Sequence, residues 1–105
     1  AVEDWLRRGV QFDAIFAGDD EGASGCIMAL RQAGKRVPED VAVVGFDDVP
    51  FARLMAPSLT TVRAPIETVG EEAVRQLITV IHGGEPVPFT LLPTELVVRQ
   101  SCGCR

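Results

Sequence analysis

The stretch Val41-Ala42-Val43-Val44-Gly45-Phe46-Asp47-Asp48 decides the fold of this 105-residue chain. Its apolar run is rich in β-branched valine and has no helix-period gaps, which predicts a strand buried on both faces, as in parallel sheets. Gly45 permits a sharp turn or the close approach of another group. Asp47 and Asp48 are therefore expected just past the carboxyl end of the strand, where open α/β sheets bind ligands.

The same pattern occurs one unit upstream. An apolar segment, residues 12–17, precedes Gly18 and the acidic residues Asp19 and Asp20. A helical segment, 20–33, separates the two strands, which is the spacing of a βαβ crossover, so we expect parallel, adjacent strands. Asp20 suits a helix N-cap or first-turn acid. Asp19 and Asp47 are the better site candidates, whereas Asp48 is expected to serve as a turn or cap residue.

Composition excludes several classes of function. The formal charge of −5 and the single lysine leave no basic stripe for binding nucleic acid. We expect no membrane contact, because no apolar run approaches the ~20 residues of a membrane span. Enzyme motifs such as the nucleophile elbow, the P-loop and H-E-x-x-H are missing, so we expect neither enzymatic activity nor a cofactor.

The cysteines do not form a disulfide framework. Cys26 lies in a predicted helix, whereas Cys102 and Cys104 form a C-x-C near the end of the sequence. A C-x-C can chelate a metal or form a strained disulfide. His82 is the single histidine and no second Cys/His pair is evident, so we expect no metal site.

The second half of the sequence alternates extended and helical patterns. Residues 58–65 are β-prone and bracketed by prolines, so we interpret them as an extended crossing segment rather than a central strand. Apolar residues at helical spacing predict a helix over 66–81, ended by His82-Gly83-Gly84. Residues 89–98 are expected to form a final strand, interrupted by Pro93, at an edge or a crossing point.

Two segments carry more apolar surface than one sheet contact needs. They are the helix at 20–33 and the loop after Asp48. Simple burial explains this surplus, and so does a subunit interface. The interface hypothesis predicts a side-by-side homodimer through Ala23, Cys26, Ile27, Leu30, Phe51, Leu54 and Met55.

Four motifs occur in a characteristic order. They are A-G-D-D-E-G-A-S-G at 17–25, G-K-R-V-P-E-D-V-A-V-V-G-F-D-D at 34–48, P-S-L-T-T-V at 57–62 and L-V-V-R-Q-S at 96–101. Together they resemble the effector-binding domain of LacI-type (lactose repressor family) transcriptional regulators over nearly the whole chain. The resemblance implies an α/β, open parallel sheet of periplasmic-binding-protein-like class I, of which this chain is the C-terminal third of a two-lobed domain.

The resemblance also implies how the chain is divided. Residues 1–58 belong to the C-terminal lobe, 59–65 form the inter-lobe crossover, 66–88 contain a helix that packs on the N-terminal lobe, and 89–105 are the final crossing strand and tail. Ligand contacts of the family carry over to Asp19, Asp47, Ile66 and Val69. Members often have Asn at position 19 and an aromatic residue near position 66, so the identity of the ligand stays open. Paired carboxylates suit the vicinal hydroxyls of a sugar or nucleoside.

The implied function is sensing of a small-molecule effector, such as a sugar, which closes the two lobes and modulates DNA binding. DNA would be bound only through a segment absent here, by a cytoplasmic homodimer. Three alternatives stay open: a sensing module with a downstream output domain, an exported sugar-binding protein, and a Mg²⁺-dependent phosphoryl-transfer enzyme. The last usually needs a lysine near the phosphate, but Lys35 lies at the opposite end of its helix.

Overall fold

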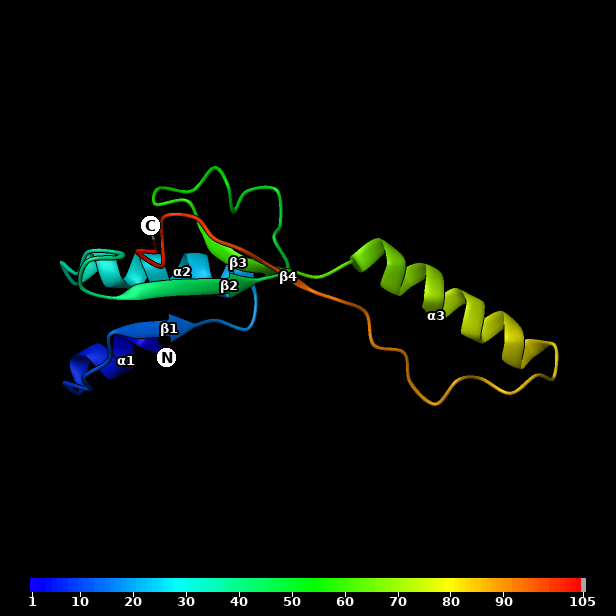
Figure 1. Cartoon of the computed structure of the whole chain (residues 1–105). Coiled ribbons are helices and arrows are strands. Elements are labelled where there is room, and N and C mark those ends of the chain that lie inside the picture. Colours follow the sequence, from blue (N-terminus) through cyan, green and yellow to red (C-terminus); the bar gives the residue numbers. More distant parts are fainter. Residues whose placement is uncertain (105) are drawn as a thin grey trace. The chain divides into compact units, whose positions relative to one another are not determined.

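The computed structural model describes residues 1–104, which form three helices and four strands. Their order is α1 (Val2–Arg7), β1 (Ala14–Phe16), α2 (Asp20–Gln32), β2 (Ala42–Phe46), β3 (Thr60–Arg63), α3 (Ile66–Ile81) and β4 (Glu95–Val97) (Figure 1). The chain divides into two compact units. The sheet unit comprises residues 1–63 and the described residues from 95 onward, and the helix unit comprises residues 64–94.

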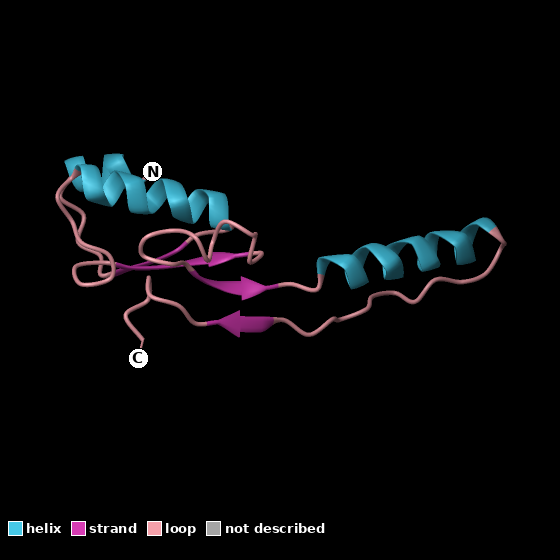
Figure 2. Ribbon diagram, turned by 90° about the horizontal axis from the view of Figure 1, so that it is seen from above, coloured by secondary structure: helices cyan, strands magenta, loops and turns pink. Residues whose placement is uncertain are grey.

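The sheet has the order β1-β2-β3-β4. β1 pairs with β2 and β2 with β3 in parallel, whereas β4 runs antiparallel to β3 (Figure 2). The pairing of Phe16 with Val44 sets the β1–β2 register, and that of Gly45 with Thr61 sets the β2–β3 register. The predicted parallel, adjacent strands and the open, mostly parallel sheet are therefore confirmed.

Helix α2 packs an apolar stripe against the sheet. Ala23, Ile27 and Leu30 lie at helical spacing, are nearly inaccessible to solvent, and belong to one cluster with Val43 and Leu59. The expectation that these three helix residues form a dimer interface is therefore wrong. The physical reason is that the sheet unit needs this stripe to bury its own strands.

Strand β2 is buried on one face and half-buried on the other, so the prediction of burial on both faces is wrong. Val43 and Gly45 lie on the covered face, whereas Ala42, Val44 and Phe46 lie on the opposite, half-buried face. Helices α1 and α2 pack against each other on one side of the sheet (Figure 2), so the covered face belongs to the helix side.

Strand β3 lies between β2 and β4, so the expectation that residues 58–65 do not form a central strand is wrong. Thr60 and Thr61 are buried there, and their hydroxyls have partners. The Thr60 Oγ1 accepts a hydrogen bond of 2.8 Å from the Arg99 amide. The Thr61 hydroxyl donates to Asp20. Because the prolines stand outside the four paired residues, they do not interrupt the sheet.

The remaining elements follow the predicted pattern in part. Helix α3 spans the predicted residues, and His82 is its C-cap. The final strand is shorter than the predicted 89–98, because only Glu95–Val97, beyond Pro93, pair with β3. None of the α3 residues Ile66–Ile81 is buried. Packing of this helix on an N-terminal lobe stays a prediction.

Gly45→Ala should destabilise the protein. A Cβ at Gly45 would overlap the Asp20 Oδ1 and would lie only 3.2 Å from the Asp20 Cα, so neighbouring atoms would have to move. Overpacking of this kind costs about 1–3 kcal/mol. Chemical unfolding of the protein measures it, with Gly18→Ala as the matched control, because nothing lies within 4 Å of a Cβ there. Equal midpoints for the two variants would contradict the close approach.

Candidate functional site

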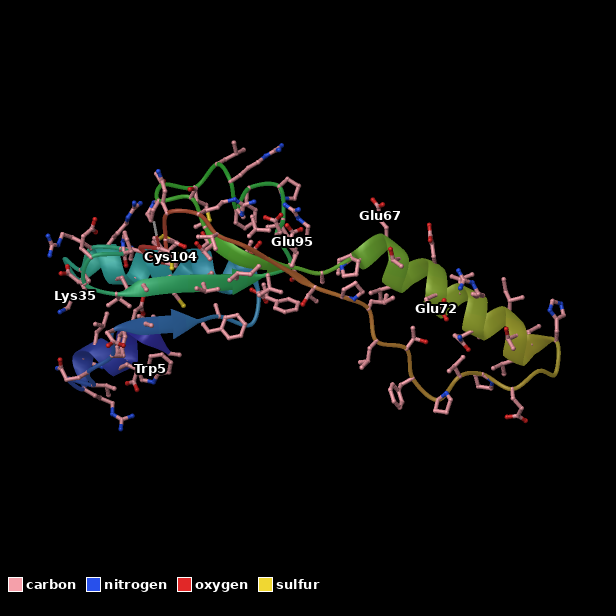
Figure 3. The ribbon with its side chains drawn as sticks, in the orientation of Figure 1. Trp5, Lys35, Glu67, Glu72, Glu95 and Cys104 are labelled. Carbon is pink, nitrogen blue, oxygen red and sulfur yellow. The ribbon has the colours of Figure 1, made fainter. Side chains whose placement is uncertain are left out.

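Polar side chains gather where the three parallel strands end. Asp19 follows β1, Asp47 follows β2 and Arg63 ends β3. Strand β4 runs the other way and begins at this edge with Glu95 (Figure 3). Since the carboxyl ends of parallel strands share one edge of a sheet, the structure brings Asp19 and Asp47 to the same edge.

Asp20 has one of the two roles predicted for it, that of a first-turn acid, and Asp19 has the other, that of the N-cap. Asp19 is the N-cap of α2, and its exposed carboxylate accepts a hydrogen bond from the Gly22 amide. Asp20, for which the cap was a predicted role, is the first residue of the helix and is fully buried. An N-cap needs only a short acceptor outside the first turn, so two adjacent aspartates are hard to distinguish by pattern.

The Asp20 carboxylate lies beneath the strand ends. It accepts hydrogen bonds from the Thr61 hydroxyl and, at 2.8 Å, from the Val49 amide. Gly45 leaves the space that this carboxylate fills. The first turn of α2 favours a negative charge through the helix dipole, which offsets part of the cost of burial. Asp20 thereby joins α2, the loop after β2, and β3.

The backbone at Asp47 and Asp48 is unusual. Both residues have positive φ, 104° at Asp47 and 54° at Asp48, which is rare for residues other than glycine. The Asp47 amide donates to the Val62 carbonyl at 2.8 Å, and the next two amides bond to Thr61 and Asp20. Neighbouring elements thus hold the loop in a strained conformation that presents the half-buried Asp47.

Asp48 is the centre of an ion network rather than a simple turn residue. Its carboxylate accepts from Arg99 at 2.6 Å and from Arg63 at 2.7 Å, and only 8% of its side chain is exposed. Burial acts to raise the pKa of Asp48, but hydrogen bonds from Arg99 and then Arg63 outweigh it, so the pKa lies below its usual value. Arg63 also pairs with Glu95 at 3.2 Å.

Arg63 and Arg99 belong to this network, although neither was predicted as a site residue. Arg99 donates to the Leu59 carbonyl at 2.8 Å as well as to Asp48, and it is half-buried. A signal was present, because Arg99 follows the apolar residues 96–98 directly. A guanidinium in such a position requires a carboxylate partner.

Ile66 and Val69 lie in the helix unit, at the start of α3. Both side chains are about half exposed, 58% for Ile66 and 46% for Val69. Val69 lines a surface hollow of about 240 Å³ together with Glu72 and Leu92. Whether Ile66 and Val69 contact a ligand stays a prediction.

The acidic strand ends do not assemble a metal site within residues 1–104. No group of three or more His, Cys, Asp or Glu side chains in this range could hold a metal ion. The carboxylates of Asp19, Asp20 and Asp48 all accept hydrogen bonds from protein donors. None of the helices in the same range is long and apolar enough to cross a membrane.

An open α/β sheet with a strained acidic loop at its carboxyl edge is typical of a ligand-binding lobe. The periplasmic binding protein-like domain family matches residues 1–102. The lactose operon repressor of Rhizobium radiobacter is 41% identical over 92 residues, which cover 88% of this chain and 81% of that protein. The regulator CelR of Thermobifida fusca is 42% identical over 102 residues, 96% of this chain and 30% of that protein.

Two solved structures extend the comparison. A complex of the regulator CelR with cellobiose has a TM-score of 0.86 and 42% identity, over 96% of this chain and 31% of that one. A lac repressor dimer bound to operator and an anti-inducer has a TM-score of 0.88 and 30% identity, over 96% of this chain and 31% of that one. The chain therefore belongs to the periplasmic binding protein-like domain family of LacI-type transcriptional regulators. It spans about a third of these two structures.

Asp48→Asn should lower the free energy of unfolding by about 2–4 kcal/mol at neutral pH, because it leaves the half-buried Arg99 without its anion. The pKa of Asp48 is lower in the folded protein than in the unfolded chain, where it is about 3.9. The ionised Asp48 therefore stabilises the protein fully above about pH 3.9, and this stabilisation is lost as the pH falls through the pKa of the folded state. The difference between wild type and variant should therefore shrink below about pH 4.

Unfolding titrations at several pH values measure the difference in free energy of unfolding between wild type and Asp48→Asn. Glu95→Gln is the matched control, because its carboxylate bonds the same Arg63 from a largely exposed position, and its effect should be much smaller. A gap between wild type and Asp48→Asn that stays constant from neutral to acidic pH would refute the assignment.

Proposed function

We propose that this chain is part of the effector-binding domain of a transcriptional regulator and that its effector is a sugar. The observation that carries the proposal is the loop at Asp47. The amides of residues 47–49 hold it at the carboxyl edge of the sheet, because they donate to one backbone carbonyl and to two side chains, those of Thr61 and Asp20. A protein that maintains positive φ at two aspartates stores strain that is typical of a ligand-binding site.

The chemistry of the edge favours a polyhydroxylated ligand. A carboxylate has acceptor oxygens for paired hydroxyl donors, and such charge-assisted bonds are stronger than neutral ones. Asp47 and Asp19 supply two carboxylates there, and Asp19 retains acceptor capacity beyond its bond to the Gly22 amide. CelR, which is similar over 96% of this chain, is known in complex with cellobiose.

The helix unit contains the two remaining predicted ligand contacts, Ile66 and Val69. Helix α3 exposes an apolar stripe that includes Ile66, Val69, Val74, Leu77, Ile78 and Ile81. In water such a stripe requires cover. We propose that an N-terminal lobe outside this chain covers it, with Ile66 and Val69 beside the ligand. Ligand binding between the lobes would close them and change the affinity for DNA, which a segment outside the chain would bind.

We also propose a homodimer through the exposed side of α2 and the loop that follows Asp48. Of the seven interface residues expected, Ala23, Ile27 and Leu30 are excluded by burial, which leaves Cys26, Phe51, Leu54 and Met55. Leu54 is 78% exposed, and Met28, at 58%, extends the patch. Met28 and Met55 line one hollow of about 350 Å³ between α2 and the loop. The lac repressor, which is similar over 96% of this chain, is known as a dimer.

Asp47→Ala should weaken effector binding roughly ten- to hundred-fold, because a charge-assisted hydrogen bond contributes ~1.5–3 kcal/mol. Titration calorimetry of the complete regulator with cellobiose and other disaccharides measures the affinity. Asp47→Gly should lose as much affinity while relieving the positive φ, which separates the carboxylate from the backbone strain.

Asp13→Ala is the matched control, since Asp13 is an exposed aspartate that stands before β1, away from the carboxyl edge. It should bind like wild type. Full affinity of Asp47→Ala for a sugar that binds the wild type would show that the proposed site is wrong.

Leu54→Glu should shift the complete regulator from dimer to monomer, because it places a charge in the proposed apolar interface. Sedimentation at tens of micromolar protein measures the assembly state, with Leu54→Met as the control that keeps the side chain apolar. A wild-type monomer at these concentrations, or a Leu54→Glu dimer as stable as the wild type, would contradict the interface.

A further inference from the structure

The Cys102-Gly103-Cys104 motif lies in a tight turn of the sheet unit. The Gly103 amide donates to the Gln100 carbonyl at 3.1 Å, and Gly103 has a φ of 71°, which favours glycine. The turn brings the Cys104 amide to 3.3 Å from the Cys102 Sγ, to which it donates. Figure 3 shows Cys104 on the tail that returns along the sheet. The backbone is therefore already folded back between the two thiols.

Ser101 fixes the base of this turn. It is fully buried beside β2, where its carbonyl accepts from the Val43 amide at 2.9 Å and its hydroxyl donates to the Val43 carbonyl at 2.6 Å. The Thr60 amide in turn donates to the Ser101 hydroxyl at 2.8 Å. With Ser101 held between two strands, Cys102 has a defined position, unlike a cysteine in a free tail.

The three thiols of residues 1–104 have different surroundings. All are free, Cys104 is exposed, and Cys26 and Cys102 are half-buried. Burial raises the pKa of Cys26. Burial also acts to raise the pKa of Cys102, but hydrogen bonds from Thr60 and Cys104 outweigh it, so the pKa is lowered. The hydrogen bond and charge of Cys102 raise the pKa of Cys104. The hydrogen bond from the Cys104 amide to the Cys102 sulfur favours a thiolate at Cys102 over one at Cys104.

We propose that Cys102 and Cys104 are a redox pair, which hydroperoxides oxidise to a disulfide within one chain. The Cys102 thiolate attacks the terminal peroxide oxygen, the O–O bond breaks, and a sulfenic acid and the hydroxide or alkoxide leaving group form. The leaving group takes a proton. The Cys104 sulfur, as it loses its proton, then attacks the Cys102 sulfur and releases water. Overall, two thiols and one hydroperoxide give one disulfide, one water and one alcohol, or two waters with hydrogen peroxide.

Redox chemistry fits the motif better than metal binding. A structural zinc site needs four ligands, and within residues 1–104 no third metal-ligating side chain completes a cluster with the two cysteines. A disulfide across one intervening residue closes a small, strained ring, and strained, exposed disulfides are easily reduced. The proposed disulfide is therefore reversible by cellular thiols, as a regulatory modification requires.

The test uses the complete regulator, fully reduced and then treated with an equimolar amount of hydrogen peroxide. Mass spectrometry of alkylated peptides should show a disulfide between Cys102 and Cys104 that dithiothreitol reverses. Cys102 should react about tenfold or more faster than Cys26, which is half-buried in the chain and belongs to the proposed dimer surface. Sugar and DNA binding do not enter this readout, so the outcome is independent of the proposed function.

Three serine variants assign the roles. Cys104→Ser should stop at a sulfenic acid on Cys102, which dimedone traps. Cys102→Ser should leave Cys104 reduced at the same peroxide dose, and Cys26→Ser should behave as wild type. Oxidation of Cys26 and Cys102 at equal rates, a disulfide between two chains, or unimpaired oxidation of Cys104 in Cys102→Ser would each overturn the proposal.

Discussion

The buried carboxylate of Asp20 is the contact on which the arrangement of the sheet unit depends. It belongs to the first turn of α2, accepts from Thr61 on β3 and from the Val49 amide beyond β2, and fills the space beside Gly45. One charged group thus sets the position of the helix relative to two strands. A fully buried carboxylate is stable only when donors match its oxygens, so this contact also fixes which residues face it.

A second carboxylate, that of Asp48, holds the segments that lead into and out of the helix unit. Arg63 ends β3, and Arg99 follows β4, and both bond Asp48. Asp47 therefore stands between two anchored neighbours, with Asp48 on one side and Phe46 of β2 on the other. The loop after β2 is therefore bonded, through Asp48, to the segments that precede and follow the helix unit.

The two units differ in how completely they bury their own apolar side chains. The sheet unit buries an apolar cluster under α2, and all described buried side-chain nitrogen and oxygen atoms have hydrogen-bond partners. Helix α3, in contrast, leaves its apolar stripe exposed. The chain spans about a third of the CelR and lac repressor structures.

Local patterns in the sequence determined the elements that depend on neighbouring residues. The helical period fixed α3, the apolar run to Phe46 fixed β2, and the acidic residues after two strands located the candidate site. Tertiary structure alone decided which of Asp19 and Asp20 is buried, that β3 lies inside the sheet, and that Ala23, Ile27 and Leu30 belong to the core. The physical reason is that burial and ion pairing depend on partners distant in sequence, such as Thr61 for Asp20 and Arg99 for Asp48.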